Sequence, residues 1–435
     1  MIQIFKKISI ILFLAFLASC SFTFDPAQKA TKNQEIPLKV GILLPLTGKQ
    51  ASLGQETLQA IHLAYAETRN PYVLLKIYDT KGDPIIAKDA AKKAINGGAR
   101  VIIGPILSEE TKVVFKVAEA NYIPVISLSN DIDNLVGNEN AYILANLPIV
   151  DIERIIDYAV SVKGARKFAA LVPQNKYGEV ILATIKESLK ARNLELVVYS
   201  SYPINEAKLV PYLQRLIPED ELIKYKEIDE KIKNKEEVYD EAGKLLNATP
   251  LPVLDFDTLI IGDFGRRLSL VSSHLPFLDI NYKKLNILGP SSWNDQTVFR
   301  DPVLANAFFP SYVEIGTTQF AAVYRSLYKK TPNAIQASAY DAMKLIASLA
   351  YLDSENQVII DVTKQAILSY DGKDGVLGSF FMKEDGTNQR AMSVRSINNG
   401  KSKIVDSNTN YRAFMRVPNY QKMMIELAKN NEAKK

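Results

Sequence analysis

The sequence predicts an α/β protein built from two doubly wound parallel-sheet lobes. Short apolar runs rich in valine, isoleucine and leucine recur along the chain, and segments with helical spacing of apolar residues separate them. Near-continuous apolar strands that alternate with helices are typical of a parallel sheet covered on both faces. The pattern restarts near residue 150, and 435 residues are too many for one ordinary core.

The first unit begins at residue 38. Its expected strands are short apolar runs at 38–44, 73–78, 101–103, 124–128 and 142–145. Its expected helices carry apolar residues at helical spacing and lie at 54–69, 84–96 and 109–121. Pro84 favours the start of the second helix, because the N–H that proline lacks would be unbonded in the first turn anyway.

The second unit repeats this build. Its expected helices lie at 151–162 and 177–192. Its expected strands lie at 168–172, 195–202, 258–261 and 286–288. Two consecutive α/β units of similar build predict two similar lobes.

Residues 217–247 interrupt the second unit as a charged insertion. More than half of the residues between 219 and 244 are charged, with both signs mixed. Its apolar residues fall at loosely helical spacing: Leu222, Ile228, Ile232 and Val238. One interpretation is a solvated helical insertion, and the other is an element that docks a partner.

The N-terminus has the pattern of an export signal. Lys6 and Lys7 precede a ten-residue apolar run, which is too short for a permanent membrane span but suits a signal peptide. The Leu-Ala-Ser-Cys sequence that ends at Cys20 resembles the lipobox of bacterial lipoproteins, in which the peptide is cut before the cysteine and the thiol is acylated. The alternative is a plain secretory peptide with an incidental cysteine.

This resemblance implies lipid attachment at Cys20, the only cysteine of the chain. Residues 1–19 are then a signal peptide, and residues 20–36 are a lipidated flexible tether to a membrane. Ser21 stands where an aspartate would signal retention in the inner membrane. The resemblance therefore implies the periplasmic face of the outer membrane rather than the inner membrane.

The composition argues against several classes of function. A net charge of +5 is small for 435 residues and gives no case for a nucleic-acid partner. The two histidines, His62 and His274, are far apart in the sequence, so we expect neither a metal centre nor a histidine relay. No phosphate loop, dinucleotide fingerprint or Gly-x-Ser-x-Gly elbow occurs. We therefore expect a binding protein without a cofactor rather than an enzyme.

Ligands of open α/β sheets bind beyond the carboxyl ends of the strands. In this sequence those ends carry hydroxyl, amide, carboxylate and aromatic side chains, which suit a small polar or anionic ligand. The candidate ligand-binding residues are Thr47, Leu107, Ser108, Ser127, Ser129, Asn175, Tyr177, Asp263, Phe264 and Trp293.

Some of these residues have a structural interpretation as well. Asp79, Asp83 and Asp263 lie near strand ends, where aspartates commonly cap helices and close turns. Trp293, the only tryptophan, is either a packing anchor or a wall of the ligand site.

Several short sequences, taken in order, resemble one family. Residues 40–48, Val-Gly-Ile-Leu-Leu-Pro-Leu-Thr-Gly, resemble the opening of type I periplasmic binding proteins of the Leu/Ile/Val-binding group. Further pieces fit the same frame: Ile103-Gly104-Pro105 with Ser108, Ile123-Pro124-Val125-Ile126, Tyr177-Gly178, Tyr340-Asp341-Ala342, Gly375-Val376-Leu377-Gly378 with Phe380, and Asp385-Gly386. The resemblance covers nearly all of the chain after residue 37.

This family has two doubly wound lobes joined by three hinge crossings, with the ligand held in the cleft of a Venus flytrap. The resemblance implies lobe 1 at 37–146 and 314–370, lobe 2 at 147–313 and 371–415, and a helical tail at 416–435.

The resemblance also implies roles for site residues. Ser108, Ser127 and Ser129 match positions that grip the headgroup of an amino acid, and Tyr177 matches a wall of the second lobe. The usual Ala-x-Thr sequence is replaced here by Ser127-Leu128-Ser129, and Phe264 stands where a tyrosine is usual.

A narrower resemblance involves the penicillin-binding-protein activators. It rests on residues 255–261, Arg266-Arg267, Ile287-Leu288-Gly289 and Trp293-Asn294-Asp295. Activators are outer-membrane lipoproteins whose flytrap domain stimulates a peptidoglycan synthase, so the resemblance implies a penicillin-binding protein or another cell-wall synthase as partner. The alternative is a solute receptor for branched-chain or related amino acids that feeds an ABC transporter.

Overall fold

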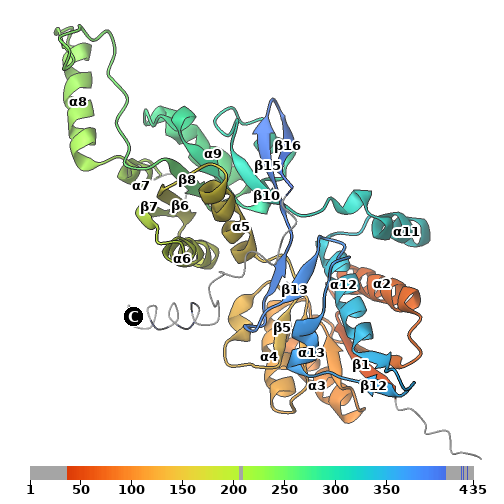
Figure 1. The fold of residues 1–435 in the computed structure, drawn as a ribbon. Coiled ribbons are helices and arrows are strands. Elements are labelled where there is room, and N and C mark those ends of the chain that lie inside the picture. The colour runs from red at the N-terminus through yellow and green to blue at the C-terminus, as the bar shows by residue number, and fades with distance from the viewer. Residues whose placement is uncertain (1–36, 205–208, 408–422, 424, 426–428, 430–435) are drawn as a thin grey trace, which may run out of the picture.

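The computed structural model describes residues 37–204 and 209–407, together with 423, 425 and 429. Cys20 and most of the expected tail at 416–435 therefore lie outside the described residues. The described residues form two α/β lobes, one above the other in Figure 1, which the chain connects three times.

The first lobe is built on a five-stranded sheet in the order β2-β1-β3-β4-β5, and all neighbouring strands are parallel. The strands are β1 (Leu38–Leu44), β2 (Val73–Asp79), β3 (Val101–Ile103), β4 (Val125–Ser127) and β5 (Ala141–Ile143). Both faces are apolar because helices cover both. The α2 and α12 helices pack together on one face, and α3 and α4 pack together on the other.

The helices and short turns of the first lobe are α2 (Ala51–Thr68), α3 (Pro84–Asn96), α4 (Ser108–Glu119), η1 (Ile132–Leu135), η6 (Ile315–Thr317), α11 (Gln319–Tyr328), α12 (Ala334–Ser348) and α13 (Lys364–Ser369). A small antiparallel ribbon is formed by β11 (Ala350–Leu352) and β12 (Val358–Ile360). Pro84 opens α3 as expected, and Asp83 caps this helix, since its Oδ1 accepts the N–H groups of Ile85 and Ile86.

The second lobe is built on a seven-stranded sheet in the order β16-β15-β10-β9-β8-β6-β7. Its strands are β6 (Lys167–Pro173), β7 (Glu195–Tyr202), β8 (Thr258–Ile261), β9 (Asn286–Leu288), β10 (Phe308–Ser311), β15 (Ser393–Asn398) and β16 (Lys401–Asp406). The strands from β7 to β10 are parallel, and β15 and β16 add an antiparallel edge.

Helices cover both faces of this sheet as well. The α5 and α6 helices bury one apolar cluster, and α7, α9 and α10 bury the other. The helices of the second lobe are α5 (Pro148–Ser161), α6 (Lys176–Lys190), α7 (Val210–Leu213), α8 (Glu219–Lys233), α9 (Gly265–Phe277) and α10 (Gln296–Phe299), and the short turns are η3 (Gln214–Leu216), η4 (Tyr282–Lys284) and η5 (Ser291–Trp293).

Within residues 37–204 and 209–407, the chain crosses between the lobes after β5, after β10 and after β14. The expected fold class, two doubly wound lobes with three crossings, is confirmed. The third crossing follows the β13–β14 hairpin, Phe380–Met382 and Asn388–Arg390. This hairpin belongs to the first lobe, because Phe380 lies in its core and Asn388 donates to the carbonyl oxygens of Ile143 and Ala145. We therefore propose 391 rather than 371 as the start of the last second-lobe segment.

Candidate functional site

The first wall of the candidate site consists of strand ends of lobe 1. Thr47 follows β1, and its hydroxyl donates to Oδ2 of Asp79 over 2.6 Å. The other carboxylate oxygen of Asp79 accepts the backbone N–H groups of Leu46, Thr47 and Lys81. These hydrogen bonds lower the pKa of Asp79 against the opposing effect of burial, the largest single influence. Asp79 therefore closes a turn that fixes the position of Thr47.

Ser108 begins α4, directly after Leu107, which is the N-cap residue. The Ser108 hydroxyl donates to the carboxylate of Asp131, and the side-chain amide of Asn134 donates to the Ser108 carbonyl oxygen over 3.2 Å. The loop after β4 therefore holds the Ser108 side chain, and Asp131 is a site residue that the sequence prediction missed.

Ser127 and Ser129 stand at the end of β4 and are buried. The Ser127 hydroxyl donates to the carbonyl oxygen of Pro105 over 3.0 Å and accepts the backbone N–H of Ser129 over 3.1 Å. It also lies 3.0 Å from the hydroxyl of Thr111. The alcohol that replaces the family's alanine therefore ties β4 to the β3–α4 loop. The Ser129 hydroxyl accepts the N–H of Asp131 and retains a proton to donate.

The second wall belongs to lobe 2 and follows β6 and β8. Asn175 caps α6, since its Oδ1 accepts the N–H of Gly178 over 2.9 Å. The ring of Tyr177 meets the ring of Phe264 edge-on, with centroids 5.4 Å apart. Burial, followed by the charges of Asp151 and Asp263, raises the pKa of Tyr177, so its hydroxyl keeps its proton at neutral pH. The pair therefore offers an aromatic surface with a hydroxyl group.

Asp263 and Trp293 have structural partners. The buried carboxylate of Asp263 accepts from the Tyr202 hydroxyl over 2.7 Å and pairs with the Arg267 guanidinium at 2.9 Å. The Trp293 ring is fully buried, and its Nε1 donates to the backbone carbonyl of Asp263 over 2.8 Å. The packing interpretation of Trp293 therefore accounts for its environment, and Asp263 is already paired with a cation.

One ion pair connects the two walls across the lobes. Nζ of Lys176, at the start of α6, lies 2.9 Å from Oδ2 of Asp133 in the η1 turn. Lys176 precedes Tyr177, and Asp133 lies two residues after Asp131, the partner of Ser108. The pair therefore brings the serine wall of lobe 1 and the aromatic wall of lobe 2 to the same place. Sequence reasoning missed it.

A buried polar cluster joins the crossings behind this contact. Asp151 on α5 accepts from the Ser291 hydroxyl over 2.5 Å and from the Tyr312 hydroxyl over 2.9 Å. Burial raises the pKa of Asp151 to about 6, although these hydrogen bonds oppose the shift. Arg390, at the third crossing, pairs with the buried carboxylate of Asp341 at 3.0 Å. These contacts tie the hinge segments to both lobes.

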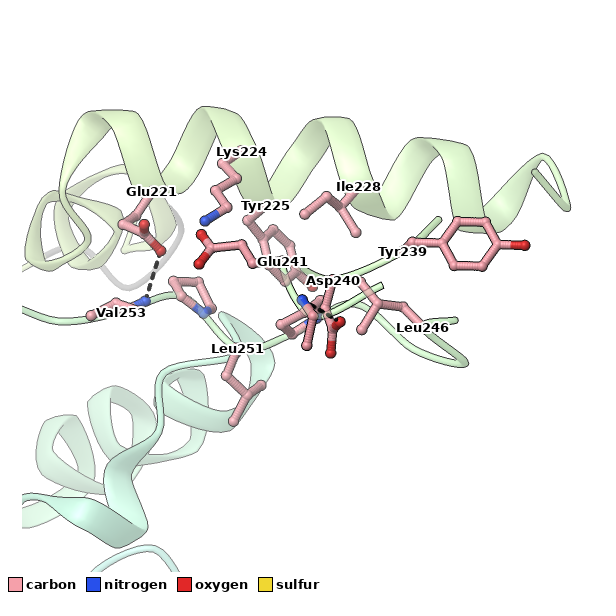
Figure 2. Close-up of a pocket in the computed structure, with 13 residues that line it drawn as sticks. Glu221, Lys224, Tyr225, Ile228, Tyr239, Asp240, Glu241, Leu246, Leu251 and Val253 are labelled. Carbon is pink, nitrogen blue, oxygen red and sulfur yellow. Dashed lines mark hydrogen bonds between the residues drawn. The ribbon is translucent and has the colours of Figure 1, made fainter. Parts of the chain in front are cut away.

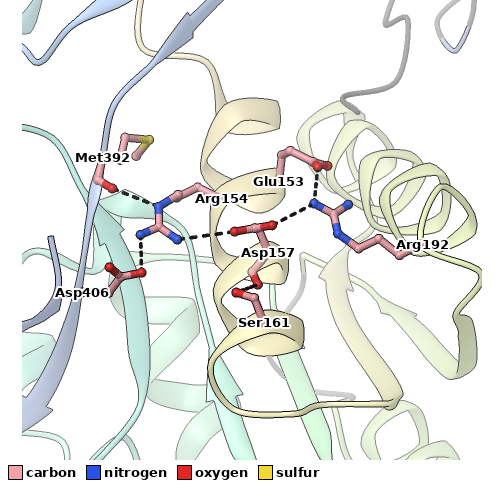
Figure 3. Close-up of polar contacts among 7 residues, drawn as sticks. All are labelled: Glu153, Arg154, Asp157, Ser161, Arg192, Met392 and Asp406. Carbon is pink, nitrogen blue, oxygen red and sulfur yellow. Dashed lines mark hydrogen bonds and ion pairs between the residues drawn. The ribbon is translucent and has the colours of Figure 1, made fainter. Parts of the chain in front are cut away.

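A second polar cluster lies on α5 within lobe 2 (Figure 3). Arg192, in the turn that follows α6, pairs with the buried carboxylate of Glu153 at 2.6 Å. Arg154 donates to the Met392 carbonyl oxygen over 2.9 Å and pairs with Asp406 at 2.7 Å. Each charge has a partner of opposite sign, so this cluster fixes α5 against α6 and the last strands.

The described residues contain no group of three or more histidine, cysteine, aspartate or glutamate side chains placed to hold a metal ion. Within the same residues, none of the helices combines the length and the apolar character needed to cross a membrane.

Sequence comparisons identify relatives over the first part of the chain. Residues 37–219 match the family model described as periplasmic binding protein. An uncharacterized protein of Rickettsia prowazekii is 25% identical over 183 residues, 42% of this chain and 48% of the relative. An uncharacterized protein of Methanocaldococcus jannaschii is 24% identical over 213 residues, 46% of this chain and 51% of the relative. The matches thus span about half the length of these curated relatives.

Structural comparisons extend over most of the chain. A putative branched-chain amino acid ABC transporter protein from Rhodospirillum rubrum aligns with a TM-score of 0.62 at 14% identity, covering 85% of this chain and 100% of that one. A branched chain amino acid ABC transporter periplasmic ligand-binding protein from Burkholderia xenovorans LB400 aligns with a TM-score of 0.59 at 14% identity, covering 87% and 96%.

A third neighbour, an ABC transporter substrate-binding protein from Sphaerobacter thermophilus, has a TM-score of 0.57 at 16% identity and covers 86% and 98%. At these identities the likeness shows the fold. The family resemblance found in the sequence agrees with these comparisons: residues 37–219 match the periplasmic binding protein model, and the described chain has the two-lobed fold of the type I periplasmic binding proteins.

Proposed function

We propose that the chain binds a small carboxylate-bearing solute, such as a branched-chain or related amino acid, between its two lobes and serves an ABC transporter. One observation carries this proposal. The Lys176–Asp133 ion pair brings hydroxyl-bearing strand ends of one lobe to the Tyr177–Phe264 aromatic pair of the other. The Ser129 hydroxyl, which retains a proton to donate, suits a carboxylate, and an aromatic surface suits an apolar solute body.

The ion pair between Asp263 and Arg267 bears on which chemical groups of a solute lobe 2 can bind. A free carboxylate in lobe 2 would favour the ammonium group of an amino acid, but Asp263 is paired with Arg267. The apolar body and the carboxylate of the solute are therefore expected to contribute more to affinity than an ammonium group. The neighbours described as branched-chain amino acid transport proteins support the same solute size.

The test compares leucine with 4-methylpentanoate, which is leucine without its ammonium group, in thermal unfolding and calorimetric titration of the purified chain. A solute at one hundred times its dissociation constant should stabilise the protein by about 2.7 kcal/mol. Ser129→Ala and Tyr177→Ala should each reduce the shift, whereas Ser273→Ala on the exposed face of α9 should not. A panel of such solutes without any shift, or shifts that survive both site variants, would contradict the proposal.

For location, we propose that the mature chain is exported and anchored through a lipid at Cys20 to the periplasmic face of the outer membrane. The lipobox-like sequence and Ser21 support this proposal. Metabolic labelling with a palmitate analogue tests it, because labelling should disappear in Cys20→Ser. Labelling that persists in this variant would exclude the anchor.

A second candidate function is the activation of a penicillin-binding protein or another cell-wall synthase. The feature that favours it is the charged helix α8, which projects from lobe 2 and contributes no buried residue to the fold. Copurification of a synthase with the full chain, lost when residues 219–253 are replaced by a short linker, would support activation. Equal copurification with both chains would count against any role of this element.

A further inference from the structure

Residues 219–253 form an arm on lobe 2. The arm consists of α8 and the segment that returns to β8, and in Figure 1 it points away from the first lobe. None of the fifteen residues of α8 is buried. A helix without a fully buried side chain adds little to the stability of lobe 2, which points to a role for the arm outside the fold.

The arm nevertheless has a defined structure. At its base, Leu222 packs against the lobe 2 core, and the Tyr225 hydroxyl donates to the carboxylate of Asp279. Further out, the return segment folds into a turn in which the N–H of Leu246 donates to the Val238 carbonyl over 2.8 Å.

Two hydrogen bonds then fasten the return segment to the helix. The Thr249 hydroxyl donates to Asp229 over 3.1 Å, and the N–H of Val253 donates to Glu221 over 3.0 Å. The return segment is therefore held alongside α8 at two points.

A groove of about 390 Å³ lies between α8 and the return segment (Figure 2). Its lining combines aliphatic, proline and tyrosine side chains with a few charges. The lining residues are Glu221, Lys224, Tyr225, Ile228, Tyr239, Asp240, Glu241, Ala242, Leu246, Pro250, Leu251, Pro252 and Val253.

Large apolar side chains are exposed along this groove. Tyr239 is 55% exposed, Leu251 46% and Val253 64%, and all three line the groove. Single exposed apolar side chains are common on protein surfaces, but a group around one concave site marks an interaction surface. These side chains would lose water contact if an apolar segment entered the groove.

Charge identifies the kind of segment that fits. Residues 219–244 carry ten acidic and six basic side chains, whereas the whole chain has a net charge of +5. Three carboxylates, Glu221, Asp240 and Glu241, line the groove against one lysine, Lys224. The arm is thus an acidic region on a basic protein, and charge complementarity favours a cationic occupant.

We propose that this groove binds a short segment of a partner protein in which apolar side chains alternate with lysine or arginine. The apolar side chains contact Ile228, Leu246 and Pro252, and the cations face the acidic side chains of the groove. This site is separate from the solute site between the lobes, and it does not depend on which function is assigned to that site.

The test uses the full chain and three synthetic peptides of equal length: leucine alternating with lysine, leucine alternating with glutamate, and serine alternating with lysine. Fluorescence anisotropy gives their affinities. The leucine–lysine peptide should bind, and each of the other two should bind at least about ten-fold more weakly. Hydrogen exchange should slow at residues 221–228 and 239–253 when the leucine–lysine peptide is bound.

Matched variants distinguish binding in the groove from attraction to the net charge of the arm. Glu241→Lys should weaken binding of the leucine–lysine peptide, whereas Glu236→Lys, the same charge change on the arm outside the groove lining, should weaken it much less. Leu251→Ser should weaken binding, and Leu327→Ser, an exposed leucine of α11, should not.

Equal effects of Glu241→Lys and Glu236→Lys would mean that only the net charge of the arm attracts the peptide, and this would overturn the proposal. So would tight binding of the leucine–glutamate peptide, or exchange protection confined to other parts of the chain. Because solute binding is measured separately by thermal unfolding, failure here leaves the assignment of the solute site unaffected.

Discussion

Asp151 is the buried carboxylate with the clearest consequence for the lobe connections. Its Oδ2 accepts from the backbone and the hydroxyl of Ser291, and its Oδ1 accepts from Tyr312. Ser291 belongs to lobe 2, and Tyr312 lies on the second crossing, so a single side chain ties α5 to the hinge. The charge of Asp151 has no cation among these contacts, which is why burial dominates its titration.

Burial raises the pKa of Asp151 to about 6 in the folded protein, above the usual aspartate value of about 3.9 in the unfolded chain. The folded state therefore holds this proton more tightly, and the free energy of unfolding should fall as the pH rises from about 4 to about 6. A shift of this size corresponds to a change on the order of 3 kcal/mol.

Denaturant unfolding of wild type and Asp151→Asn across this pH range measures the effect. The variant should lose that part of the pH dependence, and Asp220→Asn, on the exposed arm, should keep it. An unchanged slope in Asp151→Asn would assign the titration to another group.

At the scale of elements, the ends of helices show how local sequence sets the strand-to-helix turns on which the site residues lie. Asp83 caps α3, because its carboxylate accepts two N–H groups that the first turn leaves unbonded. Asp83→Ala should lower the free energy of unfolding by about 1 kcal/mol. Asp89→Ala, an exposed position in the middle of the same helix, should change it by less than about 0.5 kcal/mol. Thermal unfolding of both variants measures the effect of the cap. Equal decreases in the free energy of unfolding would show that the Asp83 cap does not stabilise the helix.

Strands whose sequence is mostly apolar or rich in β-branched and aromatic residues could be predicted. The runs at 38–44, 195–202, 258–261 and 286–288 are β1, β7, β8 and β9 within the same limits. The strand β14 could not, because its residues Asn388, Gln389 and Arg390 are polar yet fully buried. Their burial depends on partners far away in sequence, such as Asp341 for Arg390, and no local pattern reports such partners.

The residues of the candidate site differ in how far the sequence indicates them. Strand ends identified Ser108, Ser127, Ser129 and Tyr177, because parallel strands deliver their carboxyl ends to one edge. The role of Asp263 was harder to see, although the four-residue spacing to Arg267 is a signal for an ion pair at the start of a helix. The Lys176–Asp133 pair joins two turns on different lobes and has no signal in the sequence.

At the scale of the whole molecule, the relation between the lobes depends on the hinge cluster and on Lys176–Asp133. The hinge cluster is buried and holds the crossings, whereas the ion pair is open to solvent, with side-chain exposures of 56% for Lys176 and 38% for Asp133. An exposed ion pair is worth about 0.5 kcal/mol, so it biases the arrangement of the lobes without locking it.

Removing this pair should shift the lobes towards a more open arrangement. Lys176→Ala and Asp133→Ala should each change the ratio of closed to open molecules by about two-fold, as expected for a pair worth about 0.5 kcal/mol. The charge-swapped double variant, Lys176→Asp with Asp133→Lys, should restore the ratio.

Pulsed electron–electron distance measurements report this ratio from spin labels at Tyr122→Cys in lobe 1 and Phe277→Cys in lobe 2, both highly exposed, in a Cys20→Ser background. If neither single variant changes the distance distribution, the ion pair forms as a result of lobe closure and does not stabilise the closed arrangement. Under the proposed function, a solute held between the lobes binds the closed arrangement, so the single variants should also bind leucine-like solutes about two-fold more weakly.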